Sequence, residues 1–382
     1  MSERIERFVH SVTRKAVDRI PTNYYATDEF SAALCQYCET RLSAAGDEKT
    51  RSTATGLTRE DVVYNVFCCD RMRMGEKNEI RYVGPESKRC EDGSVETLWG
   101  TRQRKVDYGG GEYTETVYHP LAGITDISKI GAYQWPSPDW WAYSDVVKLC
   151  EQYPDYPLTL GYAAIGWFSW EMFGMERFLE NCIPEARAVE AVIEQVTDYC
   201  LEYYRRLISA GKDYIGKNFN MIHIADDLAT QTSLVMGEGM IRRFFEKPYR
   251  KLVDLAHKYG LLVEFHCCGS QRPIIPFFID IGVDLLNPMQ TSAAGMAPRE
   301  LQQIYGGDIA FSGGMDVQQL LPFATRDQVK DQVKYLLDTF KTGYVFEPAH
   351  NIQVGTPVEN VIAMYQAYHE YYGIPNDRLM SL

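Results

Sequence analysis

No stretch of this sequence approaches the roughly eighteen consecutive apolar residues of a membrane span, and the first eight residues lack the apolar core of an export signal. We therefore expect neither feature. Positive charge is also scarce, because 39 Lys and Arg stand against 52 Asp and Glu, giving a formal net charge of −13. This balance disfavours nucleic acid or an anionic membrane surface as a partner.

The ten cysteines do not resemble a disulfide framework, because Cys68-Cys69 and Cys267-Cys268 are adjacent pairs in a long chain. A reducing cytoplasm is the expected location. Cys35 and Cys38 form a Cys-x-x-Cys in a segment with a helical pattern, so they are expected to share a helix face. A metal or redox site there would need a second matching pair, which the sequence lacks.

The C-terminal half alternates between apolar strands and helices with short connections, a pattern typical of parallel βαβ units. The expected strands cover 221–224, 261–266, 283–287, 309–314 and 344–347, and the expected helices cover 241–259, 272–281, 298–305, 327–342 and 358–372. An earlier strand is expected over 158–164. No Gly-x-Gly-x-x-Gly follows the first strand, so the number of units favours a (β/α)8 TIM barrel over an open doubly wound sheet.

The N-terminal half is less regular. Residues 96–108 and 112–118, separated by Gly109-Gly110-Gly111, predict an antiparallel hairpin, which we interpret as an insertion flanking the barrel. With a less regular N-terminal part within about 1–150, residues 1–382 are expected to form one domain. The aromatic run 167–173 is typical of core or lid packing; if it lines the mouth, it favours a flat ligand.

Residues 263–270, Val-Glu-Phe-His-Cys-Cys-Gly-Ser, indicate a buried strand that ends in a turn. Alternate side chains on a strand share a face, which places Glu264, His266 and Cys268 together and turns Cys267 away. A carboxylate, an imidazole and a thiol are all zinc ligands. The alternative is a core strand whose histidine is hydrogen bonded within the protein and whose cysteines are small apolar core residues.

Other polar residues also follow the expected strands, where a barrel carries out its chemistry. Asp226 and Asp227 follow strand 221–224 and are candidates for a general acid or a carboxylate that supports a metal ligand. Helix N-capping and salt bridging are the structural alternatives for both aspartates. Asn287, Asp316 and His350 occupy equivalent positions after later strands.

Taken together, these segments resemble the uroporphyrinogen decarboxylase superfamily, which contains porphyrinogen decarboxylases and zinc-dependent, corrinoid-linked methyltransferases. The resemblance rests on 18–27, 225–231, His266-Cys267-Cys268-Gly269-Ser270, 282–288, Gly313-Gly314-Met315-Asp316, 348–353 and 355–360. It covers most of the chain and implies a TIM barrel.

Two features of the sequence distinguish the decarboxylase branch of that superfamily from the methyltransferase branch. Decarboxylases carry an arginine-rich loop for a substrate with many carboxylates, whereas 22–27 has no arginine after Arg19. The methyltransferases bind zinc through His-x-Cys and a later cysteine. His266-x-Cys268 matches this motif, and His350 stands in place of the later cysteine. His350 is also the decarboxylase residue at this position, where it faces the substrate without metal.

The resemblance therefore implies a zinc-dependent methyltransferase that moves a methyl group between a methoxy compound or thiol and a corrinoid. The expected metal ligands are His266, Cys268, His350 and Glu264; Asp226, Asp227 and His350 are the catalytic candidates, and Asn287, Gln231 and Asp316 are candidates for cofactor contacts. The chain lacks the Asp-x-His-x-x-Gly pattern of corrinoid domains, so methylcobalamin is expected to come from a separate corrinoid protein. A homodimer is compatible with this prediction. The alternatives are a metal-free decarboxylase and a tetrapyrrole- or corrinoid-binding protein.

Overall fold

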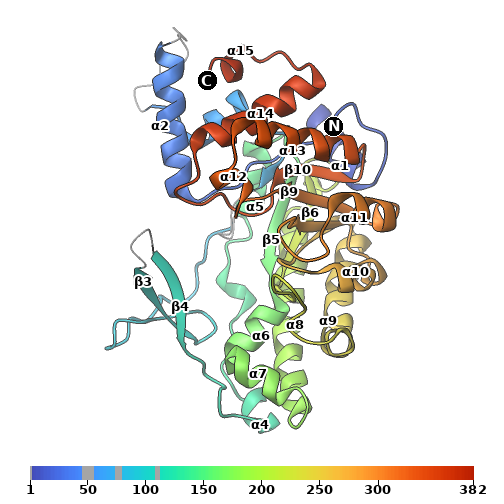
Figure 1. The fold of residues 1–382 in the computed structure, drawn as a ribbon. Coiled ribbons are helices and arrows are strands. Elements are labelled where there is room, and N and C mark those ends of the chain that lie inside the picture. The colour runs from blue at the N-terminus through green and yellow to red at the C-terminus, as the bar shows by residue number, and fades with distance from the viewer. Residues whose placement is uncertain (1, 45–55, 74–79, 108–111) are drawn as a thin grey trace.

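The computed structural model describes residues 2–44, 56–73, 80–107 and 112–382. Its main feature is a parallel sheet in which spatial order follows chain order, with helices packed around the strands (Figure 1). The strands are β1 (Met72–Arg73), β5 (Leu158–Ala163), β6 (Phe219–Ala225), β7 (Leu262–His266), β8 (Leu285–Met289), β9 (Ala310–Met315) and β10 (Tyr344–Pro348). Sequential order with helical crossovers confirms the predicted βαβ repeat.

Five crossover helices lie largely where the sequence predicts them, namely α9 (Glu238–Lys258), α10 (Ile275–Ile281), α11 (Pro298–Tyr305), α13 (Arg326–Thr339) and α14 (Val358–Tyr372). Helix α8 (Ala186–Ala210) lies between β5 and β6, where no helix is predicted from the sequence. Gly282 ends α10 in the left-handed conformation that glycine adopts without steric cost. The predicted helix 272–281 is divided, because Arg272–Ile274 forms a 3-10 turn before α10.

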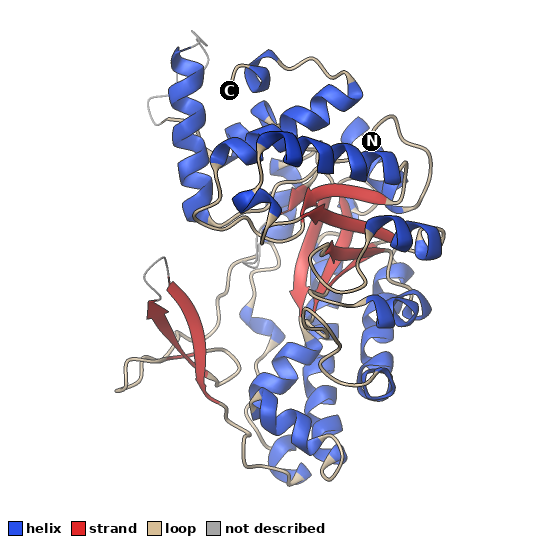
Figure 2. Ribbon diagram, viewed as in Figure 1, coloured by secondary structure: helices blue, strands red, loops and turns tan. Residues whose placement is uncertain are grey.

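A second, antiparallel sheet contains β2 (Val95–Glu96), β3 (Arg102–Asp107) and β4 (Glu112–Tyr118). The pairing of β3 with β4 confirms the predicted hairpin. Its glycine turn, Gly109–Gly111, lies outside the described residues. In Figure 2 this small sheet stands apart from the parallel strands.

Backbone hydrogen bonds continue the parallel sheet beyond β10. Asn23 N–H donates to the Phe346 carbonyl and Phe346 N–H to the Pro21 carbonyl, at 3.0 and 2.9 Å. The Thr22 carbonyl in turn accepts the N–H groups of Asp70 and Arg71, which immediately precede β1. Residues 21–23 are therefore linked by hydrogen bonds to both ends of the seven-strand order.

Helix α1 (Glu3–Val12) packs against the N-terminal ends of the strands. Phe8 and Val12 form a small buried cluster with residues from the beginning of four strands, namely Met221, Leu285, Ala310 and Val345. This end of the sheet is filled by apolar side chains, which leaves the opposite, C-terminal end for chemistry.

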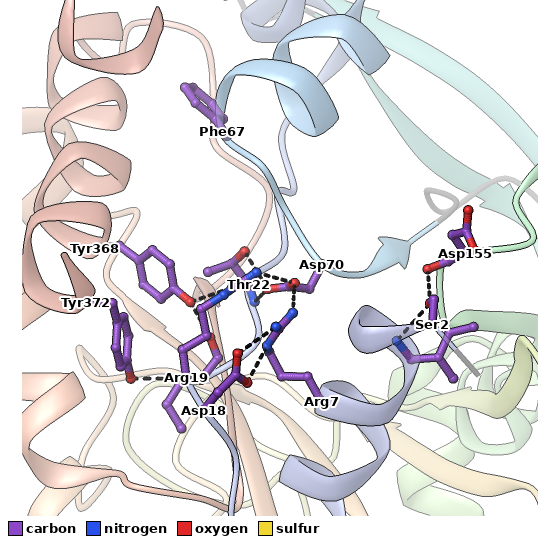
Figure 3. A network of polar contacts seen from close by, with 12 residues as sticks. Ser2, Arg7, Asp18, Arg19, Thr22, Phe67, Asp70, Asp155, Tyr368 and Tyr372 are labelled. Atoms are coloured by element: carbon purple, nitrogen blue, oxygen red, sulfur yellow. Dashed lines mark hydrogen bonds and ion pairs between the residues drawn. The ribbon is translucent and has the colours of Figure 1, made fainter. Parts of the chain in front are cut away.

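A buried charge network anchors α1 and the following segment (Figure 3). The Asp70 carboxylate accepts hydrogen bonds from Arg7 Nη1 at 2.7 Å and from Arg19 Nη1 and Nη2 at 2.5 and 2.7 Å. It also accepts the Thr22 N–H at 3.1 Å, and Arg7 pairs with Asp18 at 2.7 Å. One fully buried carboxylate thus joins three segments of the N-terminal region.

Within the described part of the chain, no helix is both long and apolar enough to cross a membrane.

Candidate metal centre and active-site cavity

Three predicted ligands come together at the C-terminal end of the parallel sheet. His266 is the last residue of β7, Cys268 follows two residues later, and His350 follows β10. One ligand atom from each lies within 4.8 Å of the others, and Cys268 Sγ is 3.3 Å from His266 Nε2. Phe265 and Cys267 are buried in the main apolar core, so the side chains alternate as the sequence predicts.

The His266 ring is oriented by Asn287 on β8. His266 Nδ1 lies 2.6 Å from Asn287 Oδ1, while Asn287 Nδ2 donates to Ser312 Oγ at 2.7 Å and to Glu347 Oε1 at 2.6 Å. Because the amide nitrogen donates to these two acceptors, Oδ1 accepts from His266. His266 therefore carries its proton on Nδ1 and directs the basic Nε2 toward Cys268.

His350 is held in the same manner by its neighbour in the chain. Its Nδ1 is hydrogen bonded to Asn351 Oδ1, which assigns Nε2 as the ligand nitrogen. The His350 ring lies 5.6 Å from the His266 ring and 5.8 Å from the Tyr25 ring, measured between centroids.

The donor set and its spacing fit zinc. Two imidazole nitrogens and a thiolate are preferred zinc donors, and tetrahedral bonds of ordinary length separate a nitrogen and a sulfur ligand by roughly 3.5 Å. The 3.3 Å between His266 Nε2 and Cys268 Sγ is close to that value. Three protein ligands leave a fourth position, as in catalytic zinc sites.

Glu264, the fourth predicted ligand, lies outside this group. Both its oxygens bind Arg71, at 2.9 and 2.7 Å, and Oε2 also lies 2.9 Å from His223 Nδ1. The side chain shares the face of His266 but is set back by two residues, about 6.6 Å along the strand. The fully buried Arg71 guanidinium compensates its charge there, so Glu264 supports His223 and does not join the metal group.

The two predicted catalytic aspartates have structural contacts of different kinds. Asp227 Oδ1 accepts the Cys268 N–H at 2.8 Å and so holds the turn that carries the thiol. The buried Asp226 carboxylate accepts the Gly166 and Trp167 N–H groups, at 2.8 and 2.5 Å, at the beginning of α6 (Ile165–Phe173). Asp226 therefore acts as a helix N-cap, as the structural alternative predicted, although the helix that it caps is distant in sequence.

Asp226 also accepts the Tyr249 hydroxyl at 2.7 Å. Burial raises the pKa of Asp226 to about 7, although these three hydrogen bonds act in the opposite direction.

The three candidates for cofactor contacts are not among the residues that line the cavity described below. Asn287 is buried behind His266, as described above. Asp316 accepts the N–H groups of Gln318, Gln319 and Leu320 and so shapes the turn after β9. Gln231 is exposed, and its carbonyl accepts the Ala294 N–H. Contacts of these residues with a corrinoid stay a prediction.

A cavity of about 530 Å³ opens beside the histidines. Its walls come from strand ends, from α6 and α8, and from the segment between β2 and β3. The lining residues are Tyr25, Thr97, Leu98, Trp99, Thr101, Gln103, Trp141, Tyr162, Trp167, Phe168, Glu171, Tyr199, Tyr203, His223, Ala225, Asp226, Asp227, His266 and His350. The small antiparallel sheet thus contributes to the site and is more than a peripheral insertion.

The aromatic run 167–173 has two roles. Trp167 and Phe168 line the cavity, whereas Trp170 and Phe173 are buried in the core. Both alternatives for this run, core packing and cavity lining, therefore apply to different members of it.

Sequence reasoning missed His223 and Trp99. His223 stands two positions before the end of β6, between Ile222 and Ile224, and a histidine between apolar residues near a strand end is the signal that could have identified it. Trp99 reaches the cavity through packing between distant segments, for which the local sequence offers no signal.

The Cys-x-x-Cys lies on α2 (Asp28–Ala44), as predicted. Burial raises the pKa of Cys38 to about 12 and also raises the pKa of Cys35. Neither thiol belongs to a metal-binding group among the described residues, and their raised pKa values disfavour redox reactivity.

Comparison with known proteins identifies the family. Residues 146–371, more than half of the chain, match the model of the family described as uroporphyrinogen decarboxylase (URO-D). The chain belongs to the URO-D family. The resemblance stated from the sequence motifs is thereby confirmed.

Relatives of this URO-D family member include methyltransferases. The chain is 24% identical over 197 residues to a methylated-thiol–coenzyme M methyltransferase of Methanosarcina mazei, covering 52% of this chain and 48% of that protein. It is 23% identical over 219 residues to the methylcobamide:CoM methyltransferase MtaA of Methanosarcina barkeri, covering 57% and 60%. The chain thus spans about half to three fifths of the length of these relatives.

A solved methyltransferase from Methanosarcina mazei has the same fold. Its TM-score is 0.64 at 17% sequence identity, with 97% of this chain and 100% of that chain covered. The predicted enzyme class, a methyltransferase, agrees with the names of the Methanosarcina mazei and Methanosarcina barkeri relatives.

Proposed function

We propose that this protein is a methyltransferase that moves a methyl group between a small thiol or methoxy compound and a corrinoid carried by a separate protein. The observation that carries the proposal is the His266–Cys268–His350 group at the end of a parallel sheet, beside a cavity. Family membership and the methyltransferase relatives support it.

His266, Cys268 and His350 are the residues that would bind zinc, and Asn287 and Asp227 position the first two of them. A zinc ion bound there supplies a Lewis acid, which lowers the pKa of a thiol or polarises an ether oxygen. His223 lines the cavity with its Nδ1 bound to Glu264, and its ring is placed to exchange a proton with the substrate heteroatom. The sulfur of a thiol substrate and the oxygen of a methoxy substrate both require such a proton exchange.

The cavity is poorly suited to uroporphyrinogen. Among the described residues that line it, none is Lys or Arg, whereas Glu171, Asp226 and Asp227 contribute carboxylates. Burying several substrate carboxylates against these groups would be costly.

For the architecture we propose a closed (β/α)8 barrel formed by one domain. Residues 21–23 would form the eighth parallel element, between β10 and the segment that leads into β1. The hydrogen bonds of Thr22, Asn23 and Phe346 support this closure. The location in the cytoplasm and the oligomeric state stay predictions.

Metal content and methyl transfer test the function. Protein purified without added metal should contain about one zinc per chain, and it should transfer the methyl group of methylcobalamin to a thiol, or demethylate a methoxy compound with reduced cobalamin. Release of carbon dioxide from uroporphyrinogen is the competing reaction, assayed on the same preparation. Decarboxylation without methyl transfer, by protein that zinc dialysis leaves metal-free, would overturn the proposal.

A further inference from the structure

We infer that the buried Glu347 carboxylate on β10 is a positioning residue that selects the tautomer of His266 and offsets the charge of a metal ion bound there. It acts through the side chain of Asn287, which lies between the two. The inference rests on the proposed metal-dependent function and deepens it, because it names the group that makes His266 Nε2 available as a ligand.

The amide of Asn287 can fit its surroundings in two orientations. The oxygen and nitrogen ends of an amide have nearly the same shape, so packing alone does not decide which end faces His266. The Ser312 hydroxyl, 2.7 Å from Asn287 Nδ2, can accept or donate and therefore fits either orientation. A neighbour that can only accept is needed to fix the amide.

Glu347 is that neighbour. Its Oε1 lies 2.6 Å from Asn287 Nδ2, and an ionised carboxylate has no proton to donate. The amide nitrogen must therefore face Glu347, so Asn287 Oδ1 faces His266 Nδ1, 2.6 Å away, and accepts its hydrogen bond. The proton is held on Nδ1, and the unprotonated Nε2 faces Cys268, as metal binding requires.

A second amide holds the carboxylate in this position. Asn23 Nδ2 donates to the other oxygen, Glu347 Oε2, from the segment that pairs with β10. Both carboxylate oxygens thus act as acceptors, and Asn23, Asn287 and Glu347 are each at most 2% exposed. Because water has little access to this chain of hydrogen bonds, the orientation of each member depends on its protein neighbours.

The charge of Glu347 has no cationic partner among the described residues. Glu264, a buried carboxylate on β7, is paired with Arg71, whereas the partners of Glu347 are the two amides. A buried carboxylate without a counter-ion is costly, and a divalent ion bound by one thiolate and two neutral imidazoles keeps a net positive charge. Metal binding beside His266 therefore stabilises Glu347, and by linkage Glu347 raises the affinity for the metal.

The second candidate histidine offers an internal comparison. His350 Nδ1 is hydrogen bonded to Asn351 Oδ1, and this oxygen also accepts from Gln353 Nε2 at 2.9 Å. Gln353 is exposed, and it has no charge. The role that we infer for Glu347 therefore concerns His266, and a change at Glu347 should leave the tautomer of His350 as it is.

Nuclear magnetic resonance of the metal-free full chain with isotope-labelled histidine reports the tautomer directly. The signals of His266 are identified among the seven histidines by their loss in His266→Gln. The parent should carry the His266 proton on Nδ1 alone. Glu347→Gln should show a mixture of the two tautomers, because its amide can donate or accept and both orientations of Asn287 become possible. A parent protein with the His266 proton on Nε2 would overturn the inference without any variant.

Ser312→Ala is the matched control. It removes the other acceptor of the same amide nitrogen and leaves the carboxylate in place, so it should keep the Nδ1 tautomer. Loss of the tautomer in Ser312→Ala would overturn the assignment to Glu347, also where Glu347→Gln fails to fold.

Zinc affinity gives a second readout. Competition with a chromogenic chelator should show Glu347→Gln binding zinc at least about tenfold more weakly than the parent, because both the orientation of His266 and a compensating charge are lost. Ser312→Ala should retain most of the parental affinity.

The outcomes separate this inference from the proposed function. A single Nδ1 tautomer together with parental zinc affinity in Glu347→Gln would overturn the role of Glu347 and leave the methyltransferase intact. A tautomer that changes as expected, in protein whose parent binds no zinc, would instead overturn the metal-dependent function while supporting the positioning role of Glu347.

Discussion

At the residue scale, the adjacent cysteines differ in what surrounds them. Cys268 lies beside His266 Nε2, whereas Cys267 is fully buried in the apolar core, where burial raises its thiol pKa well above the usual value. A thiol must lose its proton to bind zinc, so only Cys268 is placed to do so.

Replacement of these two residues gives a matched test. Cys268→Ala should lose at least about ten- to hundredfold in zinc affinity, because a ligand disappears. Cys267→Ala should bind zinc like the parent while losing about 1 kcal/mol of stability through the smaller side chain. Competition with a chromogenic chelator measures the affinity; equal losses in the two variants would refute the assigned strand face.

His369 predicts a pH dependence of stability. Burial lowers the pKa of His369 below its usual 6.5, so the native side chain resists protonation. The unfolded chain takes up this proton as the pH falls below about 6.5, and the native state therefore loses stability from there down to the folded pKa. Above that window the contribution of His369 is complete.

Melting temperatures of the parent and of His369→Gln, measured from about pH 8 to about pH 5, test this sign. The variant should lose less stability on acidification than the parent. His257→Gln is the opposite control, since the hydrogen bond that His257 donates to Asp284 raises the pKa of His257, and its stabilisation is lost as the pH rises. If the melting temperatures of the parent and of His369→Gln fell in parallel with pH, His369 would not be the source of the pH dependence.

At the element scale, helix α6 depends on a carboxylate from another strand. Its first N–H groups, those of Gly166 and Trp167, donate to Asp226 at the end of β6. The residue at the helix N-cap, Ala164, has no side chain that could replace it. Trp167 and Phe168, which line the cavity, are thus positioned by the same strand end that leads to Asp227.

Asp226→Ala should therefore destabilise the protein by about 1–3 kcal/mol, because two helix N–H groups and the Tyr249 hydroxyl lose their acceptor. Urea denaturation followed by circular dichroism measures the change. Asp126→Ala is the control, since Asp126 caps the short, exposed helix α4 (Ile127–Gly131) and should cost less than about 1 kcal/mol. Similar losses of stability in both variants would show that burial does not strengthen the capping interaction of Asp226.

At the scale of the whole molecule, Asp70 connects the N-terminal segment to the sheet. Two arginines, Arg7 and Arg19, converge on its buried carboxylate, and Thr22 N–H adds a further donor. The segment held in this way includes residues 21–23, which pair with β10. Loss of Asp70 therefore affects both α1 and the continuity of the sheet.

Asp70→Ala should cost about 3–5 kcal/mol, the range for removing one partner of a buried ion pair. Asp18→Ala removes a partner of the same Arg7, but the Asp18 side chain is 63% exposed, so the loss should stay below about 1 kcal/mol. Equilibrium unfolding in guanidinium chloride gives both values. A loss of less than about 1 kcal/mol for Asp70→Ala would show that the network contributes little to stability.

Much of the fold and the central part of the site follow from local patterns in the sequence. The boundaries of α11 and α14 coincide with the predicted ones, because a proline at a helix start and a glycine after a helix end act locally. Strand alternation likewise places His266 and Cys268 on one face. Parallel strands then bring His350 to the same end of the sheet.

Only the tertiary structure decided the contacts between distant segments. Glu264 has the right chemistry and phase for a metal ligand, yet Arg71, 193 residues earlier in the chain, takes both its oxygens. Trp99 reaches the cavity because the segment between β2 and β3 packs against Phe168 of α6 and Tyr199 of α8. Periodicity reports which face a side chain occupies, whereas the partner on that face depends on long-range packing and charge compensation, which no local pattern encodes.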